Sequence, residues 1–143
     1  YFKVQTKKTQ MKLEHLGIAV KSLENSVPVF EKIFGVKAGG QEYVAEQKVN
    51  VRKIKLENFD VELLEPTSPE SPIGKFIEKR GEGMHHLCIE VDDIEAKMQE
   101  LKDAGIRLIN DVPQVLPGRK MAFIHPKSAS GVLVELYEIT AEE

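Results

Sequence analysis

The sequence predicts an α+β protein built from two tandem βαβββ modules. A ten-residue segment occurs twice, starting at His15 and at His86, and five of its ten positions are identical. A second pair, residues 61–65 and 134–138, shares four of five residues. The two offsets, 71 and 73 positions, nearly agree. The chain therefore repeats a whole supersecondary unit, which has to pair with its copy to bury its sheet.

The first module reads as a strand, a helix and further strands. Its predicted strands share an apolar alternation of period two and cover residues 13–20, 43–56 and 59–65. We expect Asn25 and Ser26 to cap the helix, with Pro28 in its first turn and Gly35 at its end. A Pro- and Ser-rich connection then leads to a short helix at residues 73–80.

The second module repeats this order. Its predicted strands cover residues 86–91, 106–110, 120–125 and 132–139. Asp92 and Asp93 are expected to cap a helix that runs to Ala104 and stops at Gly105. The modules thus span about residues 11–70 and 84–141 of a single domain, 11–143. Residues 1–10 read as a tag or an upstream extension.

Composition excludes several classes of function. The 143 residues are 41% hydrophobic and 30% charged, as in a soluble globular domain. A net charge of −3 gives no bulk attraction to nucleic acid or an anionic membrane. No apolar run reaches the length of a membrane span, and no cleavable secretory signal is expected. The single cysteine, Cys88, cannot form an internal disulfide, so we expect a cytoplasmic protein.

Each copy of the repeat carries one histidine and one glutamate at equivalent places. If a two-fold axis relates the modules, His15, Glu62, His86 and Glu135 converge on one point. Two imidazoles and two carboxylates suit a divalent metal ion. A single strand histidine is usually hydrogen-bonded and a single strand glutamate usually faces water, but four at equivalent positions are a more specific signal.

The other histidines and the cysteine fit structural roles better. His85 precedes His86 on a strand, so we expect it to face the opposite side. His125 stands before a turn and is expected to hydrogen-bond there. Cys88 shares the parity of His86, and we expect a small buried thiol.

Several segments together resemble the methylmalonyl-CoA epimerase family of the vicinal-oxygen-chelate, or glyoxalase-like, superfamily. These segments are residues 15–20, 61–66, 71–76, 83–87, 123–127 and 131–136. The resemblance implies a curved, half-barrel mixed sheet around a metal site, and a homodimer. It places the metal ligands at His15, Glu62, His86 and Glu135, and it favours Co²⁺, with Mn²⁺, Ni²⁺ or Zn²⁺ possible. Some members carry Gln in place of Glu62.

The implied reaction interconverts (2R)- and (2S)-methylmalonyl-CoA, a coenzyme A thioester of propionyl-CoA metabolism. The ion stabilises the enediolate that forms when the C2 proton leaves, and Glu135 corresponds to the residue that moves that proton. Some relatives hold a second glutamate where this chain has Val51. The second proton donor is therefore open among Lys53, Glu46 and a bound water.

The substrate contacts are less specific in the sequence. We expect Gln47, Lys53, Gly118, Arg119 and Lys120 to bind the substrate. The loop at residues 117–120 can hold the substrate carboxylate or a CoA phosphate, although an exposed basic loop explains it equally well.

Three other functions share this motif pattern. Glyoxalase I (lactoylglutathione lyase) has the same ligand set and enediolate chemistry. An extradiol dioxygenase needs only two histidines and one carboxylate, so the fourth ligand argues against it. Non-catalytic binding proteins of the superfamily often lack the ligands that this chain retains.

Overall fold

The computed structural model describes residues 11–141. The predicted tag or extension at residues 1–10 lies outside the described residues. The elements are β1 (Lys12–Ala19), α1 (Leu23–Phe34), β2 (Glu42–Val44), β3 (Val49–Lys55), β4 (Asp60–Pro66), α2 (Pro72–Arg80), β5 (Gly83–Glu90), α3 (Ile94–Asp103), β6 (Gln114–Leu116), β7 (Arg119–Ile124), a 3₁₀ turn (Pro126–Ser128) and β8 (Leu133–Ile139). The order βαβββ thus occurs twice, with α2 between the copies, as the repeat predicts.

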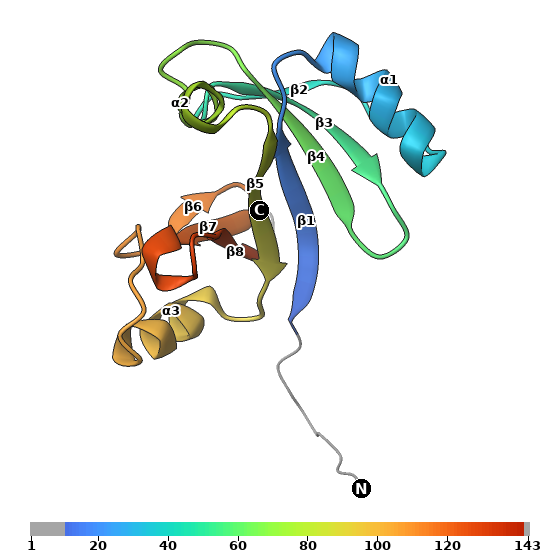
Figure 1. The fold of residues 1–143 in the computed structure, drawn as a ribbon. Helices are drawn as coiled ribbons and strands as arrows, with labels where there is room; N and C mark the ends of the chain where they lie inside the picture. Colours follow the sequence, from blue (N-terminus) through green and yellow to red (C-terminus); the bar gives the residue numbers. More distant parts are fainter. Residues whose placement is uncertain (1–10, 142–143) are drawn as a thin grey trace, which may run out of the picture. The chain divides into compact units, whose positions relative to one another are not determined.

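The chain divides into two compact units. The N-terminal unit is His15–Leu87, and the C-terminal unit comprises residues 11–14 and 88–141 of the described chain. In the N-terminal unit the strands neighbour one another in the order β2-β3-β4-β1-β5. β1 runs parallel to β4, whereas β3 is antiparallel to both β2 and β4. The C-terminal unit continues from the end of β5 in the order β5-β8-β7-β6 (Figure 1).

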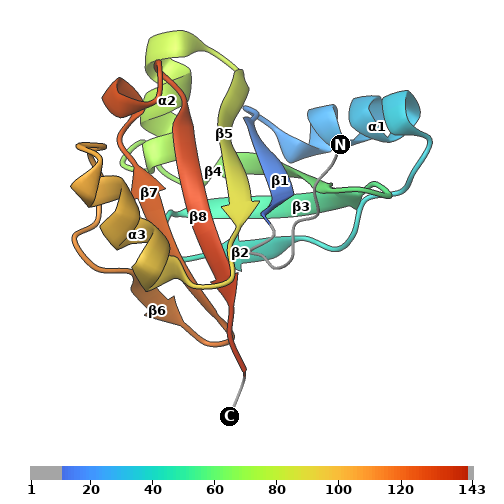
Figure 2. The same cartoon turned by 90° about the horizontal axis from the view of Figure 1, so that it is seen from below.

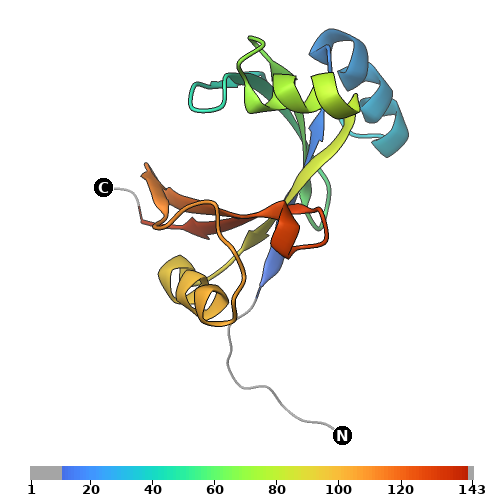
Figure 3. The same cartoon turned by 60° about the vertical axis from the view of Figure 1, so that its left-hand side comes forward.

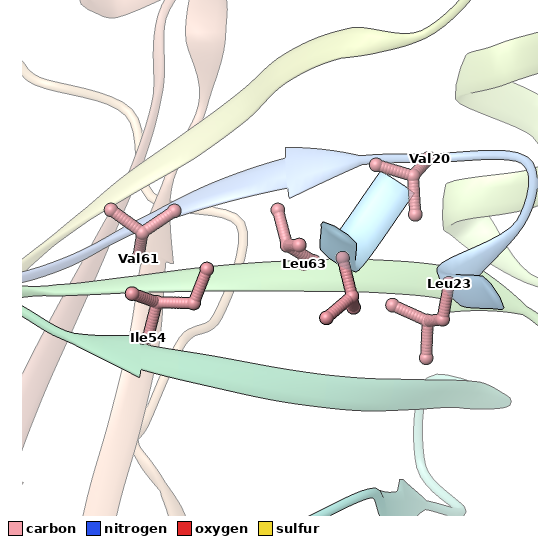
Figure 4. Close-up of a cluster of buried hydrophobic side chains, with 6 residues drawn as sticks. Val20, Leu23, Ile54, Val61 and Leu63 are labelled. Carbon is pink, nitrogen blue, oxygen red and sulfur yellow. The ribbon is translucent and has the colours of Figure 1, made fainter. Parts of the chain in front are cut away.

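α1 covers one face of the N-terminal sheet with aliphatic side chains. Figure 4 shows this cluster between the helix and β1, β3 and β4, and its buried members are Val20, Leu23, Val27, Ile54, Val61 and Leu63. The helix begins earlier than predicted, because Ser22, not Asn25 or Ser26, is the cap and its hydroxyl accepts the Asn25 N–H at 3.2 Å. Gly35 ends it in a left-handed conformation (φ 70°), as predicted.

α2 closes the other face of that sheet, and it leads directly into the connection to β5 (Figure 3). Its Ile73 is fully buried in a second cluster with Ala19, Val49, Val51 and Leu64. Alternation along β4 explains both clusters, since Val61 and Leu63 face α1 whereas Leu64 faces α2.

The single strand predicted at residues 43–56 is wrong. A turn at residues 45–48 divides it into β2 and β3. Lys48 adopts a positive φ of 53° there, and its carbonyl accepts the Thr67 N–H at 2.9 Å. The buried Ser71 hydroxyl donates to the Gln47 carbonyl at 2.8 Å and accepts the Ile73 N–H at 3.1 Å. The turn is therefore attached to the start of α2.

In the C-terminal unit, α3 packs on β7 and β8 (Figure 2). Asp93 caps the helix through the Ala96 N–H at 3.0 Å, as predicted. The strand predicted at residues 106–110 is wrong: only Leu108 bridges to β7, and β6 forms at Gln114–Leu116 instead. Two backbone hydrogen bonds flank this bridge, from the Ile109 N–H to the Phe123 carbonyl at 2.7 Å and from the His125 N–H to the Arg107 carbonyl at 2.8 Å. The Asn110 side chain then accepts the Phe123 N–H at 2.8 Å, so backbone pairing does not extend further. None of the helices in the described part of the chain has the length and apolar character that a membrane span requires.

Ser71→Ala tests the attachment of the turn to α2. We expect it to lower the free energy of unfolding by about 1–3 kcal/mol, because it removes a helix cap and leaves the Gln47 carbonyl without that donor. Ser22→Ala is the matched control: it removes the cap of α1 without a second bond, and should cost about 1 kcal/mol or less. Chemical denaturation of both variants measures the difference, and equal losses would contradict the role of the Gln47 bond.

Candidate metal centre

Few polar side chains are buried in the described part of the chain. They are His15, Ser71, His86 and Glu135, each no more than 7% exposed. Ser71 is explained by its cap and its bond to the turn. The other three are predicted ligands. Burying groups that can carry charge costs free energy unless they are paired or hold a metal, so in the N-terminal unit His15 and His86 mark the candidate site.

Two of the predicted ligands meet in the N-terminal unit. His15 on β1 and His86 on β5 have their Nε2 atoms 3.0 Å apart, with the rings nearly perpendicular at 86°. This separation is a hydrogen-bond distance between the two imidazoles. Two nitrogens bound at right angles to one ion at about 2.1 Å would also lie about 3.0 Å apart, so the arrangement is compatible with a shared divalent ion. The convergence was predicted from the repeat.

The second ring nitrogen of each imidazole, Nδ1, also has a contact. Nδ1 of His15 lies 3.4 Å from Oε2 of Glu62 on β4. Nδ1 of His86 lies 3.0 Å from Nδ1 of His85. Ligating histidines usually bond to a further group through the second ring nitrogen, which fixes the ring and its tautomer. Both rings thus have Nδ1 contacted and Nε2 directed to one point.

The predicted orientation of His85 is wrong. Strand parity placed it on the side opposite His86, but the two rings are in contact, 5.2 Å between centroids. His85 also makes an edge-on contact with Phe76 of α2, at 4.9 Å. The two adjacent histidines in the sequence were the signal that could have identified His85. Strand parity was the only reason for excluding it from the candidate site.

Gly17 makes room for the His86 ring. A Cβ at this position would lie 2.2 Å from Cε1 of His86 and 2.6 Å from its Nδ1. Such distances are far inside van der Waals contact, so any side chain here displaces the imidazole. The sequence alone did not identify this role of Gly17.

Lys53 joins the same face of the N-terminal sheet. It lies directly across from Glu62 in the β3–β4 register, and its Nζ is 3.9 Å from Oε2 of Glu62. Val51, two residues earlier on β3, is 4% exposed within the α2-covered cluster. The position at which some relatives have a glutamate is thus an aliphatic core position in this chain.

Glu135 lies on β8 of the C-terminal unit, directly across from Phe123 of β7. Tyr137 lies two residues later, so it shares the face of Glu135. Burial, together with the negative charge of Glu14, raises the pKa of Tyr137 above its ordinary value. The phenol therefore stays protonated at neutral pH.

The basic side chains of the loop at residues 117–120 lie on opposite faces of the C-terminal sheet. Lys120 bonds to Glu95 of α3 at 2.7 Å, which raises the pKa of Lys120 and lowers that of Glu95. Its side chain therefore lies on the α3 face. Arg119 has the parity of Glu135 across the strand pair. Gly118 forms the preceding turn with φ 77°.

The remaining candidates have structural positions. Nδ1 of His125 accepts the Lys127 N–H at 3.0 Å, as predicted for a turn histidine. Loss of hydration, with Arg107 and Lys127 nearby, lowers the pKa of His125. Cys88 is a buried thiol, as predicted. Gln47 lies in the turn between β2 and β3, where its carbonyl accepts the Ser71 hydroxyl.

Known proteins match this chain along most of its length. A family model described as the Glyoxalase/Bleomycin resistance protein/Dioxygenase superfamily matches residues 14–123. The mitochondrial methylmalonyl-CoA epimerase of Dictyostelium discoideum is 38% identical over 129 residues, which is 89% of this chain and 78% of that protein. The chain belongs to the methylmalonyl-CoA epimerase family of this superfamily.

Two further members of the family have the same extent. The ethylmalonyl-CoA/methylmalonyl-CoA epimerase of Cereibacter sphaeroides is 37% identical and covers 90% of this chain and 98% of that protein. A solved structure of a Streptomyces coelicolor methylmalonyl-CoA epimerase variant, in complex with 2-nitronate-propionyl-CoA, has a TM-score of 0.83 and 32% identity. It covers 92% of this chain and 96% of that chain. Membership of the epimerase family confirms the predicted resemblance and fold class.

Gly17→Ala tests the space under the His86 ring. We expect a loss of about 1–3 kcal/mol in the free energy of unfolding from overpacking, together with a shift of the His86 ring signals in NMR spectra. Gly40→Ala is the control, because a Cβ there meets nothing within 4 Å. An unshifted His86 ring in Gly17→Ala would contradict the close packing.

Proposed function

We propose that this chain is a metal-dependent epimerase that interconverts (2R)- and (2S)-methylmalonyl-CoA. The observation that carries the proposal is the pair of buried imidazoles whose Nε2 atoms converge at 3.0 Å. Membership of the epimerase family supports this reaction over glyoxalase I, extradiol cleavage or simple binding, because the named relatives above are epimerases of malonyl thioesters.

The proposed ligands of the divalent ion are His15, Glu62, His86 and Glu135. The histidines offer Nε2, and the carboxylates are the hard donors that accompany imidazole at Co²⁺, Mn²⁺, Ni²⁺ and Zn²⁺. We favour Co²⁺ among these. Glu62 contacts His15 on its Nδ1 side, so its use as a ligand requires its carboxylate or the imidazole to rotate. Glu135 is proposed from its place in the repeat, where it corresponds to Glu62.

The chemistry is removal and return of the C2 proton. A bound divalent ion would withdraw negative charge from the substrate oxygens and make C2 more acidic. In the proposed step the C2–H bond breaks, its proton passes to the Glu135 carboxylate, and its electron pair delocalises into the thioester carbonyl. The buried position of Glu135 excludes bulk water from that transfer.

Inversion also needs a proton on the opposite face of C2. Val51 carries no ionisable group, so the donor has to come from elsewhere. Lys53 lies on the same strand face as Val51 and beside Glu62, whereas Glu46 is exposed in the β2–β3 turn. A bound water is the third candidate.

For the substrate we propose contacts with Gln47, Lys53, Gly118, Arg119 and Lys120. Arg119 is the strongest of these in the C-terminal unit, since it shares the face of Glu135 and a guanidinium binds carboxylate or phosphate in a bidentate manner. Lys120 would first have to leave Glu95.

The proposed setting is a cytoplasmic homodimer that acts in propionyl-CoA metabolism. Exposed Val29 and Ile33, one turn apart on α1, are 54% and 63% exposed and are apolar enough to favour a protein contact. The net charge of −3 disfavours nucleic acid and anionic membrane partners.

Removal of the ion should abolish activity. We expect chelated protein to lose C2 exchange, and added Co²⁺ to restore it. His15→Ala and His86→Ala should each weaken Co²⁺ binding by at least about tenfold, because each removes a ligand. Elemental analysis and Co²⁺ titration measure binding, with His125→Ala as the control. Wild-type Co²⁺ affinity in both ligand variants would exclude these residues as ligands.

Glu135→Gln tests the proposed base. In deuterated water with methylmalonyl-CoA, we expect C2 exchange to slow by about 10²- to 10⁴-fold, the usual contribution of a positioned acid or base. Glu138→Gln is the matched control on the same strand; Glu138 accepts the Ile94 N–H at 2.8 Å and lies on the α3 face. Exchange at the wild-type rate in Glu135→Gln would assign the base to another residue. Absence of exchange in metal-loaded wild type would refute the epimerase function.

A further inference from the structure

His85 forms a link between α2 and a proposed metal ligand. Its ring packs edge-on against Phe76 at 4.9 Å, and its Nδ1 lies 3.0 Å from Nδ1 of His86. The guanidinium of Arg80 lies over the same Phe76 ring at 5.9 Å. The side chains of Arg80, Phe76 and His85 thus form a series of contacts from the end of α2 to the imidazole of His86.

The Nδ1–Nδ1 contact constrains the proton positions on both rings. A hydrogen bond between two nitrogens needs one N–H and one lone pair. If His86 is to offer a lone pair at Nε2, its proton has to be on Nδ1. His86 Nδ1 then donates and His85 Nδ1 accepts. In the structure as it stands, Oε2 of Glu62 lies 3.4 Å from Nδ1 of His15, and a carboxylate can only accept a hydrogen bond there.

We propose that His85 is a positioning residue that holds His86 in the tautomer and orientation that present Nε2 to the ion. The inference rests on the proposed metal site, but it concerns a residue outside the predicted ligand set. Gly17 admits the His86 ring beside β1, and the Nδ1 contact with His85 is a directional contact that selects one rotation of the ring in that position. Phe76 in turn limits the movement of His85.

Two substitutions separate the hydrogen bond from the packing of the ring. His85→Phe keeps an aromatic ring against Phe76 but removes the acceptor. His85→Asn places an amide oxygen where Nδ1 lies and removes most of the ring. We expect His85→Phe to weaken Co²⁺ binding by about 10- to 100-fold, the usual effect of losing an outer partner of a ligand. His85→Asn should stay within about threefold of wild type.

The measurement is Co²⁺ titration by visible absorption, without substrate. His125→Asn is the control for loss of a histidine that caps a turn. Unfolding curves show which variants are folded, and two-bond ¹H–¹⁵N NMR spectra of protein loaded with diamagnetic Zn²⁺ report the tautomer of His86. We expect Nε2 bound to the ion and the proton on Nδ1 in wild type and His85→Asn, and a mixture of tautomers in His85→Phe.

Several results would overturn the inference. Wild-type Co²⁺ affinity in His85→Phe, or an unchanged His86 tautomer, would exclude the positioning role. Equal weakening in both His85 variants would assign the effect to ring packing. If His86→Ala loses Co²⁺ while His85→Phe does not, only this inference fails. If wild-type protein binds no Co²⁺, the proposed metal site fails with it.

Discussion

The arrangement of polar groups in the N-terminal unit depends on the contact between the imidazoles of His15 and His86. These residues are 71 positions apart, and each is at most 7% exposed. Polar rings are buried at such cost only where their nitrogens find partners. Glu62 contacts Nδ1 of His15, and His85 contacts Nδ1 of His86. Gly17 has no side chain and so leaves room for the His86 ring. Each of these features follows from the need to bring the two Nε2 atoms together.

The sheet of the N-terminal unit separates these polar side chains from the hydrophobic cluster under α1. Its α1 face is apolar along the whole cluster. Its other face is aliphatic only where α2 covers it, around Val51 and Leu64, and becomes polar at Lys53 and Glu62. Strand alternation makes this division possible, because neighbouring residues of one strand serve opposite faces. α2 therefore has two functions in the fold: it closes the apolar part of the face and supports His85 beside the polar part.

The sequence predicted the module order and the His15–His86 contact because two copies of one sequence segment are expected to fold alike. That expectation needs no knowledge of how side chains pack. The sequence could not predict the division of β2 and β3, since Lys48 in a left-handed conformation depends on a carbonyl contact with Thr67, 19 residues away. It also missed the role of His85. Parity fixes the direction of a Cα–Cβ bond, whereas the position of the ring depends on side-chain torsions and on Phe76 from another element. The strand expected at residues 106–110 is reduced to a single bridge at Leu108, because the Asn110 side chain takes the Phe123 N–H that would continue the pairing.

The two glutamates of the repeat differ in their cross-strand neighbours, and this difference bears on their proposed roles. Lys53 lies across from Glu62, and Phe123 lies across from Glu135, in equivalent strand pairs. The Lys53 ammonium lies 3.9 Å from Oε2 of Glu62, so this carboxylate already has a cation beside it within its own strand pair. Glu135 has an aromatic side chain at the equivalent cross-strand place. The repeat thus supplies two similar carboxylates with different cross-strand neighbours, which fits the proposal that Glu62 only holds the ion whereas Glu135 also takes and returns the C2 proton.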